Sequence, residues 1–79
     1  MRAAFTDYLE SQYLRLFSEQ EQAYALAMRK YTPRMLAERM VAGLADGSAN
    51  KDGEGIKNTC KHFGIKYTYK AIKEFLATP

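Results

Sequence analysis

The stretch IKNTCKHFGIKYTYKAIKEFL, residues 56–76, combines the clearest helical pattern of this chain with a one-sided charge. Its apolar residues Ile56, Cys60 and Phe63 are spaced by four and three, which places them on one face of a helix. Gly64 follows and is the residue type that most often ends a helix. The first half of the stretch is therefore predicted to form a short helix that stops at Gly64.

A second short helix is predicted to follow the turn. Thr68 has the side chain of a helix N-cap, because its hydroxyl can accept a hydrogen bond from a free backbone N–H of the first turn. Behind it, Tyr69, Ile72 and Leu76 recur at helical spacing and are expected to face inward. The two helices together form a predicted hairpin over residues 56–77.

The charge of the chain is concentrated in this region. Residues 1–48 carry six basic and six acidic side chains, whereas residues 49–79 carry six lysines against three acids, so the whole net charge of +3 lies there. No acid interrupts the segment from Lys57 to Lys73. On helices, lysines spaced by three or four share one side, so each predicted helix has a basic face.

A basic face of this kind attracts phosphate, because each lysine near a phosphate releases condensed counterions. The residues predicted to bind nucleic acid are Lys57, Lys61, Lys66, Tyr67, Thr68, Lys70 and Lys73. The four at the start of the second helix, 66–68 and 70, are the main candidates for reaching bases, with Asn58 and His62 as lesser ones. The alternative is a solvated outer surface with the function elsewhere.

The same stretch resembles the helix-turn-helix of bacterial and phage DNA-binding proteins. Cys60 is a small residue four positions before the turn glycine, Gly64, and a threonine leads the second helix. In that family the apolar positions of the recognition helix fall six and nine residues after the glycine, where this chain has Lys70 and Lys73. The resemblance implies DNA binding, with a shorter turn or a different helix crossing.

The N-terminal part is predicted to be helical from Ala3 to Lys30, since it contains neither proline nor glycine. Ser18 and Glu21 spell a capping box, which favours a break near Ser18. Thr32 and Pro33 indicate a helix start, and the pattern that follows predicts a helix over 33–45. Helical spacing in the segment 3–31 is shown by Phe5, Leu9, Tyr13 and Leu16, and a second stripe is suggested by Leu14, Phe17, Tyr24, Met28 and Tyr31.

These patterns predict a single all-α domain over residues 1–79, a small bundle of four to five helices. A helical body over about 3–45 is followed by a glycine-rich loop over 47–55 and by the basic hairpin. A chain of this size is near the lower limit for an independent core. Homodimerisation is therefore one expectation.

Six tyrosines in 79 residues are the other unusual feature. Tyrosine suits interfaces because it buries a large area and keeps a polar tip. Tyr8, Tyr13 and Tyr24 are accordingly predicted to line a homodimer seam or a partner-protein surface, and core filling is the alternative. Met28, Met35 and Met40 are expected in the core.

The sequence offers little for catalysis or for a cofactor. Cys60 and His62 lie two positions apart, about 200° around a helix, so they cannot pair as nucleophile and base. One cysteine and one histidine do not complete a zinc site, and the glycines match no phosphate-binding loop. No apolar run reaches the roughly 18 residues of a membrane span. The start of the chain lacks the build of a signal peptide.

The expected function is therefore that of a small, non-enzymatic, cytoplasmic DNA-binding regulator or accessory protein without cofactor or metal. The alternative is a protein-interaction module or a small inhibitor that blocks another macromolecule. Inhibitors of phages and mobile elements, anti-CRISPR proteins among them, share this size and this lack of catalytic residues.

Overall fold

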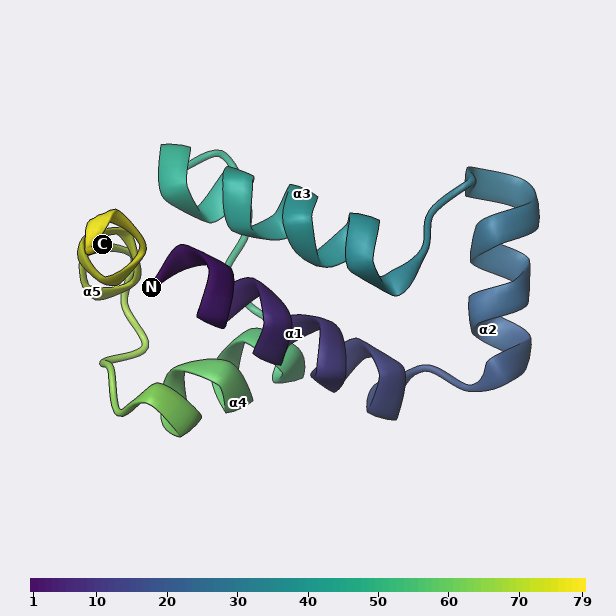
Figure 1. Ribbon diagram of the computed structural model, residues 1–79, viewed down its shortest axis with the longest axis horizontal. Coiled ribbons are helices and arrows are strands. Elements are labelled where there is room, and N and C mark those ends of the chain that lie inside the picture. Colours follow the sequence, from purple (N-terminus) through teal and green to yellow (C-terminus); the bar gives the residue numbers. More distant parts are fainter.

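The computed structural model describes residues 1–79 apart from the side chain of Arg29. Within these residues it contains five α-helices, one π-helical turn and no strand (Figure 1). The elements are α1 (Arg2–Leu16), α2 (Glu19–Tyr24), η1 (Ala25–Arg29), α3 (Pro33–Asp46), α4 (Glu54–Phe63) and α5 (Tyr69–Ala77). The predicted all-α class is confirmed.

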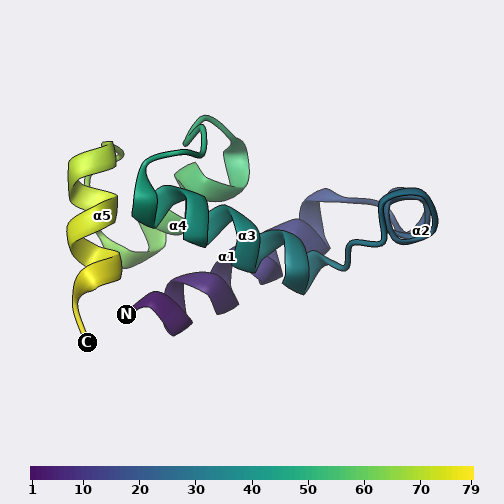
Figure 2. The same cartoon turned by 90° about the horizontal axis from the view of Figure 1, so that it is seen from above.

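Helix α1 is the centre of the fold. Figure 1 shows α3 along one side of α1 and α4 along the other, and α5 lies across one end of the pair. Figure 2 shows the same arrangement from above, with the axis of α5 steeply inclined to those of α1 and α3. Every other long helix therefore packs against α1.

The core is formed by apolar side chains from all four of these helices. Phe5 and Leu9 of α1 are completely buried, and full burial of one such side chain contributes about 1.5–3 kcal/mol. The remaining buried apolar residues are Tyr13, Ala37, Val41, Leu44, Ile56, Cys60, Ile72 and Leu76. The predicted inward residues Ile72 and Leu76 are thus confirmed.

An aromatic cluster connects the C-terminal helices to α1. The ring centroid of Phe5 lies 6.1 Å from that of Phe63 and 6.1 Å from that of Phe75, and the latter two are 5.1 Å apart. Aromatic pairs at such distances add about 0.5–1.5 kcal/mol each beyond their burial. The cluster holds the end of α4 and the side of α5 on one residue of α1.

The predicted break at Ser18 is confirmed. The backbone N–H of Glu21 donates to Ser18 Oγ at 3.1 Å, and the N–H of Ser18 donates to the Glu21 carboxylate at 3.4 Å. The chain turns there, so α2 and η1 leave the bundle and span the ends of α1 and α3 (Figure 1). Lys30 then adopts a left-handed conformation, and Thr32 caps α3 as predicted.

The prediction that Met28 and Met35 lie in the core is wrong. Tyr24 is 61% exposed and Met28 is 67% exposed, and Leu14 and Met35 are exposed as well. Because the chain turns at Ser18, α2 and η1 point away from the core and no helix lies against them. Of the three methionines expected in the core, only Met40 packs against it.

The C-terminal boundaries need smaller corrections. Helix α4 begins at Glu54, so the predicted loop is shorter and covers residues 47–53. Gly64 ends α4 in the left-handed conformation, as predicted. Tyr69 is 40% exposed rather than inward, because its hydroxyl accepts a hydrogen bond from the backbone N–H of Lys51 at 3.1 Å. That bond keeps its ring over the loop.

Gly43 of α3 provides a test of the packing at the end of this helix. The chain folds back after Gly47, and the N–H groups of Ser48 and Ala49 donate to the Gly43 carbonyl. A Cβ added at Gly43 would lie 2.6 Å from the Cβ of Ala49.

We expect Gly43→Ala to destabilise the fold by about 1–2 kcal/mol, because overpacking outweighs the gain of up to about 1 kcal/mol in helix propensity. Denaturant unfolding measures the change. In an Ala49→Gly background the same substitution should cost much less, because the clashing methyl group is gone. Equal costs in both backgrounds would contradict this account.

Candidate nucleic-acid interface

All five lysines of the predicted basic face are exposed. They lie on three elements: Lys57 and Lys61 on α4, Lys66 in the connection 64–68, and Lys70 and Lys73 on α5. Among the side chains that the structure describes, the ion pairs involve only Arg34 and Lys51 as cations. The charge of these five lysines is thus available to a ligand.

Helix α5 lies at the end of the molecule opposite α2, whereas α4 lies along the side of α1 (Figures 1 and 2). Helix α4 packs on α1, and α5 packs on α3 and α1, so each is held by the body. Their mutual contact includes the ring pair of Phe63 and Phe75. The lysines therefore occupy two steeply inclined helices and their connection, not one continuous helical stripe.

Tyr67 and Thr68 hold the connection between α4 and α5. The hydroxyl of Tyr67 donates to the carbonyl of Lys51 at 2.7 Å, and the ammonium of Lys51 lies 4.0 Å from the centroid of the Tyr67 ring. Thr68 Oγ1 accepts a hydrogen bond from the N–H of Ala71 at 3.2 Å and so caps α5. We therefore revise the prediction that these two side chains reach bases and assign them to positioning Lys66 and Lys70.

Lys73 is the lysine whose charge is most opposed by a neighbour. It is close enough to Asp46, at the end of α3, to contribute to the lowered pKa of that carboxyl. The larger cause of the lowered pKa is Ser48, which donates hydrogen bonds to the Asp46 carboxylate. Of the five lysines, Lys73 should therefore contribute least to anion binding.

A hollow between α1 and α4 adds further polar groups beside Lys61. This α1–α4 hollow has a volume of about 340 Å³ and no acidic lining residue. Its lining residues are Tyr8, Gln12, Arg15, Asn58, Lys61 and His62. The rings of Tyr8 and His62 stack at 3.9 Å, and the amide of Asn58 donates to Gln12 Oε1 at 3.1 Å. Both predicted lesser contacts, Asn58 and His62, thus line a hollow that contains two cations.

Arg15 is the member of this site that the sequence analysis missed. Gln12 lies four residues after Tyr8, and Arg15 lies three residues after Gln12, which is the spacing of one helical face. That polar stripe lies beside the apolar stripe of the same helix, and its spacing could have been recognised in the sequence. What the sequence did not indicate is that α4 packs along it and brings Lys61 next to it.

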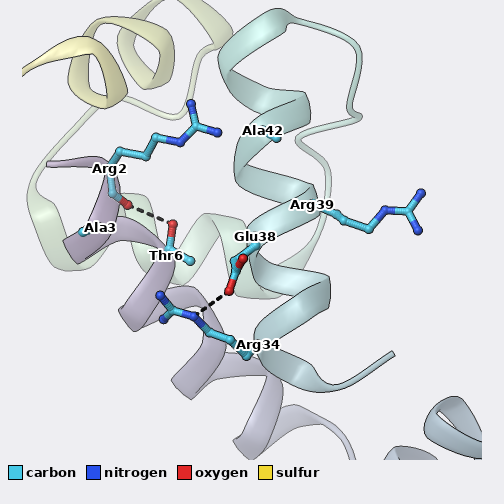
Figure 3. A pocket seen from close by; sticks show the side chains of 7 residues that line it. All are labelled: Arg2, Ala3, Thr6, Arg34, Glu38, Arg39 and Ala42. Atoms are coloured by element: carbon cyan, nitrogen blue, oxygen red, sulfur yellow. Dashed lines mark hydrogen bonds and ion pairs between the residues drawn. The ribbon is translucent and has the colours of Figure 1, made fainter. Parts of the chain in front are cut away.

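A second hollow, between α1 and α3, shows how acids neutralise one cation elsewhere in this molecule (Figure 3). It is lined by Arg2, Arg34 and Arg39 together with Glu38. The guanidinium of Arg34 forms ion pairs with Glu38 at 3.0 Å, with Glu10 at 3.7 Å and with Asp7. All three carboxylates therefore pair with Arg34, and among the described side chains Arg2 and Arg39 form no ion pair.

The three tyrosines predicted to form a seam do not come together. Tyr8 lies on the α4 side of α1, stacked on His62. Tyr13 is buried and stacked on Phe17 with ring centroids 5.4 Å apart, and its burial raises the pKa of its hydroxyl. Tyr24 alone is exposed, on α2. The prediction of a shared tyrosine surface is therefore wrong, because the break at Ser18 separates Tyr24 from α1.

The remaining reactive groups do not assemble into a second kind of site. Cys60 is buried in the core, and burial raises the pKa of its thiol, which disfavours the nucleophilic thiolate. Within the described residues there is no cluster of three or more histidine, cysteine or acidic side chains that suits a metal ion. None of the helices in the described residues is both long and apolar enough to cross a bilayer.

No protein-family model, curated protein sequence or solved structure matches this chain. Any functional assignment therefore depends on the geometry and charge of the surfaces described above.

The raised pKa of the Cys60 thiol predicts a pH dependence of stability. Above the ordinary thiol pKa of 9.0 the unfolded chain loses this proton first, so the native state binds more protons and the free energy of unfolding falls as pH rises. The contribution is fully present below pH 9 and lost at higher pH. Denaturant unfolding between pH 8 and 11 should show a steeper decline for the natural chain than for Cys60→Ala, and parallel curves would contradict the assignment.

Proposed function

We propose that this protein binds DNA through a basic surface that consists of Arg15, Lys57, Lys61, Lys66, Lys70 and Lys73, and that it acts as a non-enzymatic regulator or accessory protein. The observation that carries the proposal is the exposure of the five lysines without acidic partners. Acids elsewhere in the chain do neutralise cations, as Asp7, Glu10 and Glu38 do for Arg34. The basic surface is therefore a local exception in a chain that is otherwise balanced.

The dimensions of the molecule suit a duplex. It measures 21 Å across each of its two shorter axes, and DNA of that length carries about 12 phosphate charges, one for every ~1.7 Å of its axis. The phosphates therefore outnumber the six cations of the basic surface. Binding would be limited by how many cations approach the backbone, and the release of counterions would make it strongly dependent on salt.

The α1–α4 hollow extends the basic surface from α4 onto α1. Arg15 and Lys61 line this hollow from opposite helices, and guanidinium groups suit phosphate because their N–H groups form a planar fork. The stack of Tyr8 on His62 forms its aromatic part. These features support a phosphate contact at the hollow in addition to those of the lysines.

The proposed binding should have little sequence preference. Phosphate contacts position a protein but carry no base information, and the polar groups of Tyr67 and Thr68 are used within the chain. Only Lys66 and Lys70 remain from the residues predicted to reach bases. We therefore expect an affinity in the non-specific range, with a Kd of about 10⁻⁴ to 10⁻⁶ M at physiological salt.

A fluorescence anisotropy titration with mixed-sequence duplex DNA at several salt concentrations tests the proposal. The logarithm of the binding constant should fall linearly with the logarithm of the salt concentration, with a slope of about −4 to −5 if five cations contact phosphates. Replacing Lys66 and Lys70 together by Ala should reduce the magnitude of that slope by about 2.

The matched control removes two cations that line the α1–α3 hollow of Figure 3 and are not part of the basic surface. Arg2→Gln with Arg39→Gln changes the net charge by the same amount but should leave the slope nearly unchanged. Equal losses in the two double variants would show a general charge effect without a defined surface. Absence of binding at low salt would remove the DNA proposal in favour of a protein-interaction role.

Arg15→Gln tests the contribution of the α1–α4 hollow separately. This exposed side chain makes no ion pair among the described residues, so the fold should be unaffected. We expect the salt slope to fall in magnitude by about 1 and the affinity at low salt to decrease. An unchanged slope would confine the interface to α4, α5 and their connection.

A further inference from the structure

Exposed apolar side chains gather at the end of the molecule opposite α5 (Figure 1). Among the described residues, six of the eight large apolar side chains that are exposed lie between positions 14 and 35. They are Leu14, Leu16, Tyr24, Leu26, Met28 and Met35. They belong to α2 and η1, together called the arm below, and to the ends of α1 and α3 that carry the arm. Such clustering marks an interaction site.

The arm has little support from its own chain. It stands across the ends of α1 and α3 with no helix behind it (Figures 1 and 2), and its packing is mostly between α2 and η1 themselves. Beneath it is a hollow of about 600 Å³, lined by Tyr24 of the arm and by Phe17, Tyr31 and Leu36. The arm covers only residues 19–29, and isolated helices shorter than about 12–15 residues are marginal in water. A partner that covers the arm would stabilise it.

The charge along the arm identifies the partner. Glu19 and Glu21 lie at its start, and Lys30 lies at its end. Two such segments that run antiparallel place the acidic start of each beside the basic end of the other, and their helix dipoles then oppose each other favourably. A two-fold axis between Tyr24 and Ala25 brings Glu19 of each copy level with Lys30 of the other. The arm is therefore complementary to itself.

We propose that two copies of this chain form a two-fold symmetric homodimer in which their arms pair antiparallel. In this register Leu26 of one copy lies level with Ala23 of the other, three positions away on the same helical face, so a large side chain opposes a small one. A stable interface buries about 800 Å² on each partner, more than one short helix supplies. Leu16 and Met35, at the base of the arm, extend the apolar area that the second copy covers.

The homodimer is independent of DNA binding. The arm and α5 lie at opposite ends of the longest dimension of the molecule, which is 34 Å (Figure 1). Pairing through the arms therefore leaves the lysines of α5 far from the dimer axis, and Arg15 is the member of the basic surface nearest to the contact. Its success or failure can be measured without DNA.

Sedimentation equilibrium of the full chain over a range of protein concentrations tests the proposal. The natural chain should be dimeric, and Leu26→Glu should raise the dimer Kd at least about 100-fold, because it places two charges in the apolar contact. Leu26 is exposed in one copy, so the variant should keep its helical circular dichroism. It should also keep its DNA salt slope, which separates loss of the dimer from loss of the basic surface.

Charge reversal tests the antiparallel register. Glu19→Lys and Lys30→Glu should each weaken the dimer about tenfold or more, because each places like charges together at two symmetric positions. The double variant restores opposite charges at both positions and should recover most of the affinity. A natural chain that stays monomeric at millimolar concentration would overturn the proposal. A dimer that is insensitive to Leu26→Glu, or a double variant as weak as the singles, would overturn it as well.

Discussion

The fold depends on the burial of one face of α1. Phe5 and Leu9 are completely buried, and the helices that cover them come from three distant parts of the chain. A chain of 79 residues has little core to spare, so each of these contacts is a large share of the total stability. The ring of Phe5, in contact with Phe63 and Phe75, also fixes where α4 and α5 lie. The position of every basic side chain proposed to bind DNA follows from this burial.

The two ends of the molecule differ in whether their helices bury their apolar side chains on the rest of the chain. At one end α4 and α5 bury their apolar faces on α1 and α3, and five lysines remain exposed on these helices and their connection, together with Tyr69. At the other end the capping box of Ser18 and Glu21 stops α1 before it can continue into a longer packed helix. The arm that follows keeps its apolar side chains exposed. A DNA surface at one end and a dimer contact at the other are compatible, because they share no residue.

Charge pairing decides which cations are available. Arg34 of the α1–α3 hollow is paired with three carboxylates, and Lys51 is held by Asp52 and the Tyr67 ring. The lysines of α4 and α5 have no such partners among the described residues. The net charge of a sequence region was therefore a better guide to the basic surface than the number of basic residues in that region. Arg15 entered the site only through the packing of α4 on α1.

The sequence by itself determined the local structure. The all-α class, the capping box at Ser18, the cap at Thr32 with Pro33 and the stop at Gly64 all depend on residues within one helical turn of each other, and the structure confirms them. The sequence also predicted that Lys57 and Lys61 would lie on one helix. The tertiary structure decided which helices pack against each other and which side chains they cover. Met28 was predicted to lie in the core because periodicity cannot tell a helix that packs against its own chain from one that does not. Tyr13 and Tyr24 were predicted to share one surface because the sequence does not indicate how far the chain turns at Ser18. The turn itself was predictable, but its direction depends on long-range burial on α1.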